Sequence, residues 1–304
     1  MLKKLQIEGG RAVPSTADPA PIWVYVNPDE SERKQLVETL KIDEHTLASA
    51  LDPDEVSRME TEPEHVAVVF KRPKTYRAED NLTFKTLSTG LFLFKERVIV
   101  VMTDDVPLFN GKSIPPRATS ADLMLRILSS TIAHFIGHLR SIVMISEEVE
   151  QKIHRSMENK FLFNLFTLEK SLVYYLNALN GNAVVIDKLR NNSTRLGFTQ
   201  EQQEFLEDLA IENQQCYRQA EIYSNILSSL MDARASIVGN NLNRLMKTLT
   251  IITLGVMLPT LVVSIFSMNV GIPLQSYPHA FWIIMGLAAV SSAAVVMVWR
   301  WKRW

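Results

Sequence analysis

The chain has 304 residues and a formal net charge of −1, with 32 Lys and Arg against 33 Asp and Glu. This balance argues against nucleic acid as a partner. A single cysteine, Cys216, excludes an internal disulfide. The first residues show neither a long apolar run nor a small-residue cleavage site, so we expect no signal peptide there.

Residues 1–118 are predicted to form a cytosolic α+β domain. Short apolar runs bounded by turn or charged residues indicate strands, at 22–26, 66–71, 87–94 and 98–102. The last two flank the turn-like segment 95–97 and are expected to form a hairpin. Helical patterns near 29–40 and 43–50 lead us to expect a mixed sheet packed with helices. We find no phosphate loop, nucleophile elbow or metal-binding cysteine cluster, and we expect no enzyme and no organic cofactor.

Residues 119–198 are predicted to form a pair of helices. Apolar residues recur at steps of three and four along the first helix, and Thr119 or Ser120 can cap its start, with Asp122 in the first turn. The second helix is expected over about 161–189, and Gly197 ends the pair. His134 and His138 share one face of the first helix at a spacing that can bind zinc. Packing or solvation is the commoner role for such a pair, and we favour it here.

Residues 199–267 are predicted to form one long stalk helix that continues into a membrane. Thr199 and Gln202 form a capping-box pattern at its start. Only two glycines and Pro259 interrupt the pattern afterwards, so the helix would be about 100 Å long at 1.5 Å per residue. One copy of the chain cannot bury such a rod, which favours a coiled-coil-like assembly of several copies around a shared axis.

The membrane part consists of two charge-free stretches, Thr248–Phe266 and Phe281–Trp299. Each is about as long as the roughly 20 residues that cross a bilayer. We expect the first transmembrane helix at about 246–267, an extracytoplasmic loop at 268–280, and the second transmembrane helix with a basic tail at 281–304. The competing interpretation, a pair of buried core helices, is less natural for two such runs joined by a short Pro/Gly loop.

Charge predicts the topology. Lys and Arg residues flank both spans on the sides away from the connecting loop, and the loop itself has none: Arg244, Lys247, Arg300, Lys302 and Arg303. The positive-inside rule therefore places both termini in the cytosol of a multi-pass protein of the inner (plasma) membrane. Four tryptophans suit the interfacial belts: Trp282, Trp299, Trp301 and Trp304.

A stripe of polar and methionine side chains runs along the first span with steps of three and four. A step pattern of this kind places its members on one helix face: Asn243, Met246, Thr250, Thr253, Met257, Thr260, Ser264 and Ser267, with Leu249 at its edge. Helix packing is one explanation, because Ser and Thr allow close approach and bond to their own backbone. The wall of a pore is the other, with amide rings for a hydrated cation and apolar rings as constrictions.

The segment 266–273, Phe-Ser-Met-Asn-Val-Gly-Ile-Pro, resembles the signature of the CorA family, a Gly-Met-Asn tripeptide after a Pro-containing first membrane helix. The resemblance extends through 243–252 and 258–261, the two-span C-terminus and the segment 168–174. It covers roughly residues 20–304, and the last 70 residues carry most of its specificity.

The resemblance implies a funnel-shaped homopentamer that takes up Mg²⁺ along the membrane potential, with internal divalent cations as regulators. It places the selectivity mouth at Ser267, Met268 and Asn269. It places Asn243, Met246, Leu249, Met257 and Thr260 on the pore wall, together with their neighbours in the stripe. The implied partners are divalent cations, the lipid bilayer and further copies of this chain.

Two features depart from the family pattern. Ser267 occupies the position of the family's glycine, and the loop 268–280 has no Asp or Glu. Weaker electrostatic collection of cations is expected from such a loop. The transported ion is therefore Mg²⁺ or a related ion such as Zn²⁺, Co²⁺ or Ni²⁺, and a non-conducting membrane-anchored sensor or scaffold of the same fold is the alternative.

The resemblance also implies a regulatory metal site on the long helix. Asp208 falls where relatives place an acid that binds Mg²⁺ between protomers, and Glu207 and Glu212 are close in sequence. Carboxylates from two subunits repel unless a cation bridges them, so internal Mg²⁺ would hold a closed state. A solvated helix face is the alternative. The partner acid would come from Glu55, Glu79 or Asp80.

Overall fold

The computed structural model describes residues 1–15, 20–109, 111, 113–155, 159–271, 273 and 276–302. Arg303 and Trp304, which the sequence assigns to the basic tail and the interfacial belt, lie outside the described residues. The chain forms two compact units, Met1–Met231 and Asp232–Trp304. We describe each unit by itself.

A seven-stranded mixed sheet forms the centre of the first unit. Its strands follow the spatial order β2-β1-β3-β7-β6-β5-β4, with bounds Leu2–Glu8 (β1), Arg11–Pro14 (β2), Ile22–Val26 (β3), Arg58–Thr61 (β4), Val66–Pro73 (β5), Thr86–Leu93 (β6) and Val98–Met102 (β7). The pair β3–β7 is parallel, with Val24 opposite Val100, and the other pairs are antiparallel. The predicted hairpin is confirmed, because β6 and β7 pair directly.

Three strands were not predicted: β1, β2 and β4. β1 and β2 are only half-buried or exposed along their lengths, so they lack the continuous apolar run that identifies a buried strand. β4, Arg-Met-Glu-Thr, buries only Met59. Their pairing with better-marked neighbours, β1 with β3 and β4 with β5, places them in the sheet.

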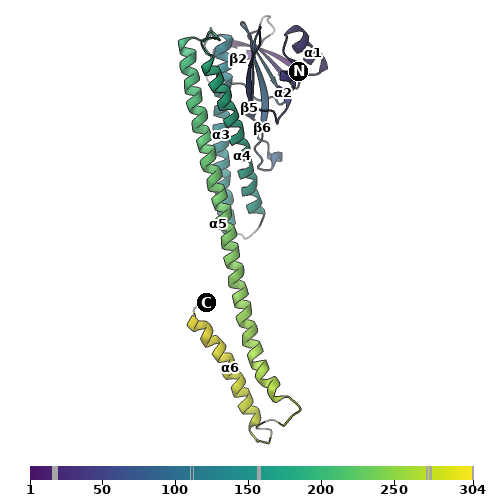
Figure 1. The fold of residues 1–304 in the computed structure, drawn as a ribbon, viewed down its shortest axis with the longest axis vertical. Coiled ribbons are helices and arrows are strands. Elements are labelled where there is room, and N and C mark those ends of the chain that lie inside the picture. Colours follow the sequence, from purple (N-terminus) through teal and green to yellow (C-terminus); the bar gives the residue numbers. More distant parts are fainter. Residues whose placement is uncertain are drawn as a thin grey trace. The chain divides into compact units, whose positions relative to one another are not determined.

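Helices cover both faces of the sheet (Figure 1). One face carries α1 (Glu30–Lys34), the π-helical segment η1 (Gln35–Thr39) and α2 (Glu44–Leu51), with buried side chains such as Trp23, Tyr25 and Leu36 between the layers. The other face packs against α3 (Ser120–Arg155) and α4 (Asn159–Asn191). A short 3₁₀ helix, η2, spans Ala78–Asp80. Strand β5 is buried at every position because helices cover both of its faces.

The helix starts use the caps expected from the sequence. The backbone N–H of Thr199 donates to Gln202 Oε1 (3.0 Å), and the N–H of Gln202 donates to Thr199 Oγ1 (3.3 Å), which is the predicted capping box. The Gln202 amide also donates to Asp122 Oδ1 (2.8 Å) and Thr119 Oγ1 (3.0 Å). One side chain therefore joins the starts of α3 and α5.

Asn182 of α4 ties the helical layer to the sheet. Its Oδ1 accepts from the backbone N–H of Lys71 (2.8 Å) and from Ser57 Oγ (3.1 Å), and its Nδ2 donates to Lys71 O (2.8 Å). Lys71 lies beyond the end of the β4–β5 pairing, so Asn182 replaces the missing strand partner. Gly181 allows this approach, because an added Cβ there would lie 3.0 Å from Ser57 Oγ.

Helix α5 runs without a break from Gln200 to Phe266 and continues from the first unit into the second. In the first unit its buried residues, among them Leu206, Leu209 and Cys216, join the core shared with α3 and α4. In the second unit it packs against α6, which spans Ala280–Lys302. The mixed sheet with helices and the long C-terminal helices agree with the predicted fold class.

Candidate functional site

Within the described residues, three helical stretches are long and apolar enough to cross a membrane by length and composition. Half of the most apolar 18-residue stretch of α3 is buried inside the protein. The corresponding stretches of α5 and α6 are 0% and 6% buried. Because α3 buries its apolar residues on the sheet, we assign it to the core. The C-terminal part of α5 and α6 leave most of their apolar residues to an environment outside the chain.

One face of α5 packs against α6. The half-buried residues of α5 in this region recur at helical spacing: Ile251, Gly255, Pro259, Val262 and Phe266. On α6 the covered residues are Ala288, which is buried, with Ile284, Ser291, Ser292 and Val295 around it. Most of these α6 residues are small or β-branched, and small residues allow membrane helices to approach closely.

The predicted polar stripe lies on the other side of α5. Thr253, Met257, Thr260 and Ser264 each precede an α6-facing residue by two positions, which is about 200° around a helix at 3.6 residues per turn. All members of the stripe are exposed, including Asn243, Met246, Leu249, Thr250 and Ser267. From Thr253 to Ser264 the stripe therefore lies on the side of α5 away from α6.

The threonine hydroxyls of the stripe have a defined orientation. Each donates to the backbone carbonyl four residues earlier: Thr250 to Met246 (2.8 Å), Thr253 to Leu249 (2.9 Å) and Thr260 to Val256 (2.7 Å). This is the backbone bonding that the packing interpretation requires. It also leaves the oxygen lone pairs as acceptors, because each hydroxyl proton is already used. An accepting oxygen suits the water shell of a cation.

The stripe meets α6 at one end only. Asn243, Met246 and Thr250 border a groove of about 650 Å³ whose other wall is formed by α6 residues, including Val295, Val298 and Trp299. The members from Thr253 onward do not border this groove. The two ends of the stripe thus have different surroundings within a single chain.

The predicted mouth follows the end of α5. Ser267 closes the helix, because both its backbone N–H (3.2 Å) and its hydroxyl (2.9 Å) donate to Ser264 O. Ser267 does not have the left-handed backbone angle that would favour glycine. The serine therefore fits this position without backbone strain. Met268 and Asn269 are exposed, while Ile272, Leu274 and Gln275 of the loop lie outside the described residues.

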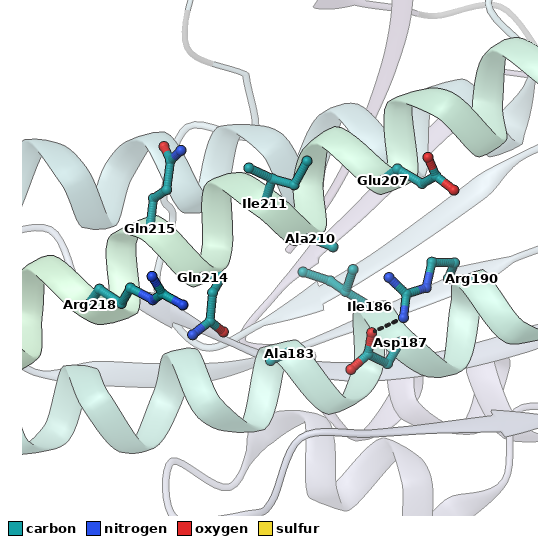
Figure 2. A pocket seen from close by; sticks show the side chains of 10 residues that line it. All are labelled: Ala183, Ile186, Asp187, Arg190, Glu207, Ala210, Ile211, Gln214, Gln215 and Arg218. Carbon is teal, nitrogen blue, oxygen red and sulfur yellow. Dashed lines mark ion pairs between the residues drawn. The ribbon is translucent and has the colours of Figure 1, made fainter.

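The predicted regulatory acids point in two directions. Glu207 lines a groove of about 550 Å³ between α4 and α5, where Asp187 and Arg190 form an ion pair at 3.0 Å and Arg218 lies farther along (Figure 2). Asp208 and Glu212 do not line this groove; they lie one turn apart on a neighbouring face of α5. Glu207 thus borders the groove that Arg190 also lines, whereas Asp208 lies outside it, although both acids are exposed.

The three candidate partner acids have neighbours of their own. Glu55 Oε1 pairs with Arg58 Nη1 at 2.8 Å. Asp80 accepts from the backbone N–H of Arg77 at 2.8 Å and lies 3.7 Å from Lys74 Nζ, and these contacts lower its pKa. Glu79 is exposed. Among the described residues of one chain, no three His, Cys, Asp or Glu side chains are placed to hold a metal ion.

His134 and His138 form a packed pair beneath the sheet. Their Nε2 atoms are 3.1 Å apart, and His138 Nδ1 lies 2.5 Å from the hydroxyl of buried Tyr175. Burial lowers the pKa of both histidines to about 4, and for His134 the neighbouring His138 and Arg72 add to this effect. Both rings are therefore neutral at pH 7. This environment agrees with the favoured packed role.

Sequence reasoning did not single out two polar side chains near these sites. Arg72 is 2% exposed; its Nη2 donates to Pro107 O at 2.8 Å, and its Nε and Nη1 have no hydrogen-bond partner among the residues that the structure describes. Ser292 of α6 places its Oγ 3.5 Å from Gly255 O of α5. The alternation of β5 could have indicated an inward Arg72, but the contact of Ser292 requires the register of two helices, which composition does not contain.

Residues 20–301 match the protein family described as CorA-like Mg²⁺ transporter protein. The cobalt/magnesium transport protein CorA of Methanocaldococcus jannaschii is 25% identical over 294 residues, which cover 93% of this chain and 91% of that protein. The complete structure of the CorA magnesium transporter from the same organism has a TM-score of 0.80 at 22% identity, covering 98% and 96% of the two chains. The structure of full-length CmaX protein has a TM-score of 0.73 at 18% identity, covering 97% and 94%.

Proposed function

Because the chain belongs to the CorA-like Mg²⁺ transporter family, we propose that it conducts divalent cations, Mg²⁺ first, through a pore shared by several copies. The family match agrees with the expectation that the chain is a transporter and not an enzyme. The observation that carries the pore proposal is the exposed polar stripe of α5, which from Thr253 to Ser264 lies on the side away from α6. Five copies are the number that the family resemblance implies.

In this proposal the pore wall is graded along its length. Asn269, with Ser267 and Met268, forms the outer mouth, where amide oxygens accept from the water shell of the ion. Mg²⁺ suits such a site because it dehydrates reluctantly. Below it, Thr260, Thr253 and Thr250 present hydroxyl oxygens that accept hydrogen bonds. Rings of Met257, Leu249 and Met246 form apolar constrictions, and Asn243 forms the inner amide ring.

The direction of transport follows from topology and potential. With both termini in the cytosol of the inner (plasma) membrane, the loop 268–280 faces outward and the basic ends of α5 and α6 face inward. A potential that is negative inside drives a divalent cation inward with about 4.6 kcal/mol per 100 mV, twice the value for one charge.

Regulation by internal divalent cations is proposed at Asp208 and Glu212. Asp208 is exposed and Glu212 is half-buried, one turn apart on a face of α5 outside the groove, which leaves them available to an acid of a neighbouring copy. Glu207 is the weakest of the three candidates because it faces the groove with Arg190. A cation that bridges carboxylates of two copies would hold the closed state and release it when the internal concentration falls.

Two observations favour a second ion or a non-conducting scaffold: Ser267 at the family's glycine position and a loop without acids. The structure accommodates Ser267 at the end of α5, so the loop is the stronger of the two. A loop without carboxylates collects cations less well, which reduces the rate of capture more than the affinity of the pore.

Flux into liposomes tests the proposal. The purified full-length chain is reconstituted, and uptake of Mg²⁺, Co²⁺, Ni²⁺ and Zn²⁺ is measured under an inside-negative potential. We expect Mg²⁺ uptake that Asn269→Leu abolishes and that Phe163→Ala, an exposed substitution on α4, leaves unchanged. Uptake of no divalent ion by a folded oligomer would refute transport and leave the scaffold.

A further inference from the structure

Pro259 creates a defect in the backbone hydrogen bonding of α5. In an α-helix each carbonyl accepts from the N–H four residues later, so Gly255 O would accept from residue 259. Proline has no N–H. Inside a bilayer no water replaces the missing donor, and an unsatisfied carbonyl there costs several kcal/mol. The sequence therefore requires another donor for Gly255 O.

The structure offers one candidate donor on α6. Ser292 Oγ lies 3.5 Å from Gly255 O, and both residues are half-buried where the two helices meet. One position further along α5, the carbonyl of Val256 receives the hydroxyl of Thr260 at 2.7 Å. Two successive carbonyls next to the proline thus have a hydroxyl close by, one from α5 itself and one from α6.

The neighbour of Ser292 has a different role. The hydroxyl of Ser291 donates to Ala288 O of its own helix at 2.7 Å, so it is already satisfied. Ala288 is buried against α5 and small enough to let the helices approach. Ser292 is the hydroxyl of this pair that reaches the other helix. The pair Ser291 and Ser292 therefore provides its own internal control.

We propose that Ser292 is a positioning residue of the pore, which donates to the carbonyl that Pro259 leaves without a backbone donor. It thereby fixes the direction of the α5 helix axis at the level of Met257 and Thr260, which lie within one turn of the proline. This inference rests on the proposed pore function for its effect on conduction. The hydrogen bond itself does not depend on that function.

A double-mutant cycle tests the assignment. Ser292→Ala should lower the melting temperature and reduce Mg²⁺ flux about threefold, the size of a typical interhelical hydrogen bond in a membrane. In a Pro259→Ala background, residue 259 again supplies an N–H, so Ser292→Ala should change neither quantity. Ser292→Thr, which keeps the hydroxyl, should restore both. Ser291→Ala is the matched control and should behave as wild type.

A spectroscopic measurement tests the bond directly. Gly255–Val256 is the only Gly–Val step in the sequence, so [¹³C-carbonyl]Gly with [¹⁵N]Val selects this one carbonyl in the full-length protein in bilayers. We expect its ¹³C shift to move upfield in Ser292→Ala, to return in Ser292→Thr, and to stay unchanged in Ser291→Ala.

Additive effects in the cycle, or an unchanged carbonyl shift in Ser292→Ala, would overturn the assignment. The carbonyl shift and the melting temperature need no ion flux. If the ¹³C shift of the carbonyl changes as expected but no ion is transported, the hydrogen bond is supported and the pore proposal is refuted. If ions are transported but the ¹³C shift does not change, only the proposed role of Ser292 is refuted.

Discussion

The two units treat apolar residues in opposite ways. In the first unit, α3 is apolar enough to resemble a membrane span, yet half of its most apolar 18-residue stretch is buried against the sheet and α4. In the second unit, the most apolar 18-residue stretches of α5 and α6 are 0% and 6% buried. The first unit satisfies its apolar surface within the chain, whereas the second needs lipid and other copies. Length and composition alone select both the core helix α3 and the membrane helices α5 and α6, and burial distinguishes the two kinds.

The largest loss of stability is expected in the core of the first unit. Phe135 is fully buried and stacks edge-on against Tyr175 with ring centroids 5.0 Å apart. Phe135→Ala should destabilise the protein by about 3–5 kcal/mol through lost burial and a cavity. The melting temperature in detergent measures this. Met257→Ala on the exposed stripe is the contrasting variant, and an equal loss of stability from it would contradict the difference in burial between the two units.

A second prediction concerns acid. The pKa of His134 and His138 is about 4 in the folded protein against 6.5 in an unfolded chain. The unfolded chain therefore binds more protons between these values, and stability is lost as pH falls from about 6.5 through 4. Each pKa unit corresponds to about 1.4 kcal/mol.

The measurement is the melting temperature as a function of pH. In the double variant His134→Gln with His138→Gln, the melting temperature should fall less steeply than in wild type as the pH is lowered. His45, an exposed histidine of α2, provides the control: His45→Gln should keep the full acid dependence. A pH dependence unchanged by the double variant would contradict the assignment.

A third, smaller effect is expected at the joint between α4 and the sheet. Asn182→Ala removes the partner of Lys71 N and Lys71 O. Leaving buried backbone groups unsatisfied costs about 1–3 kcal/mol each, and we expect a loss near 2 kcal/mol after water enters. The melting temperature of Asn180→Ala, an exposed neighbour two positions earlier, should not change. Equal stability of the two variants would show that Asn182 is not a structural link.

The smallest effect lies in regulation and leaves both units folded. Asp208→Ala should weaken inhibition of flux by internal Mg²⁺ about tenfold, which is within the usual range of coupling between sites. Glu207→Gln, which faces the groove of Figure 2, should shift inhibition much less. Flux at a series of internal Mg²⁺ concentrations measures both. If Glu207→Gln had the larger effect, the regulatory face of α5 would have to be reassigned.

The sequence predicted the strongly periodic elements and missed those that depend on neighbours. Continuous apolar runs identified β3, β5, β6 and β7, and turn and capping residues located the helices. β1, β2 and β4 carry mixed polar residues and become strands only through pairing. The stripe on α5 was visible from spacing alone, because a heptad pattern fixes one face of a helix.

Contacts between elements were beyond sequence reasoning. The separation of Glu207 from Asp208 follows from the position of α4, and the contact of Ser292 with Gly255 follows from the register of α6 against α5. Neither register leaves a signal in composition or periodicity. The capping box of Thr199 and Gln202 was predicted, but its link to Asp122 was not, since that link spans 80 residues of chain.

Cysteine accessibility along α5 measures whether the stripe lines a water-filled passage. The only native cysteine, Cys216, is 1% exposed, so Cys216→Ser provides a background in which single cysteines are introduced at Thr253, Met257, Thr260 and Ser264. Ile252 and Leu258, which are exposed on other faces, are the controls. We expect a charged, water-soluble thiol reagent to block Mg²⁺ flux at the four stripe positions and not at the two controls. Block at Ile252→Cys and Leu258→Cys without block along the stripe would contradict a pore on this face.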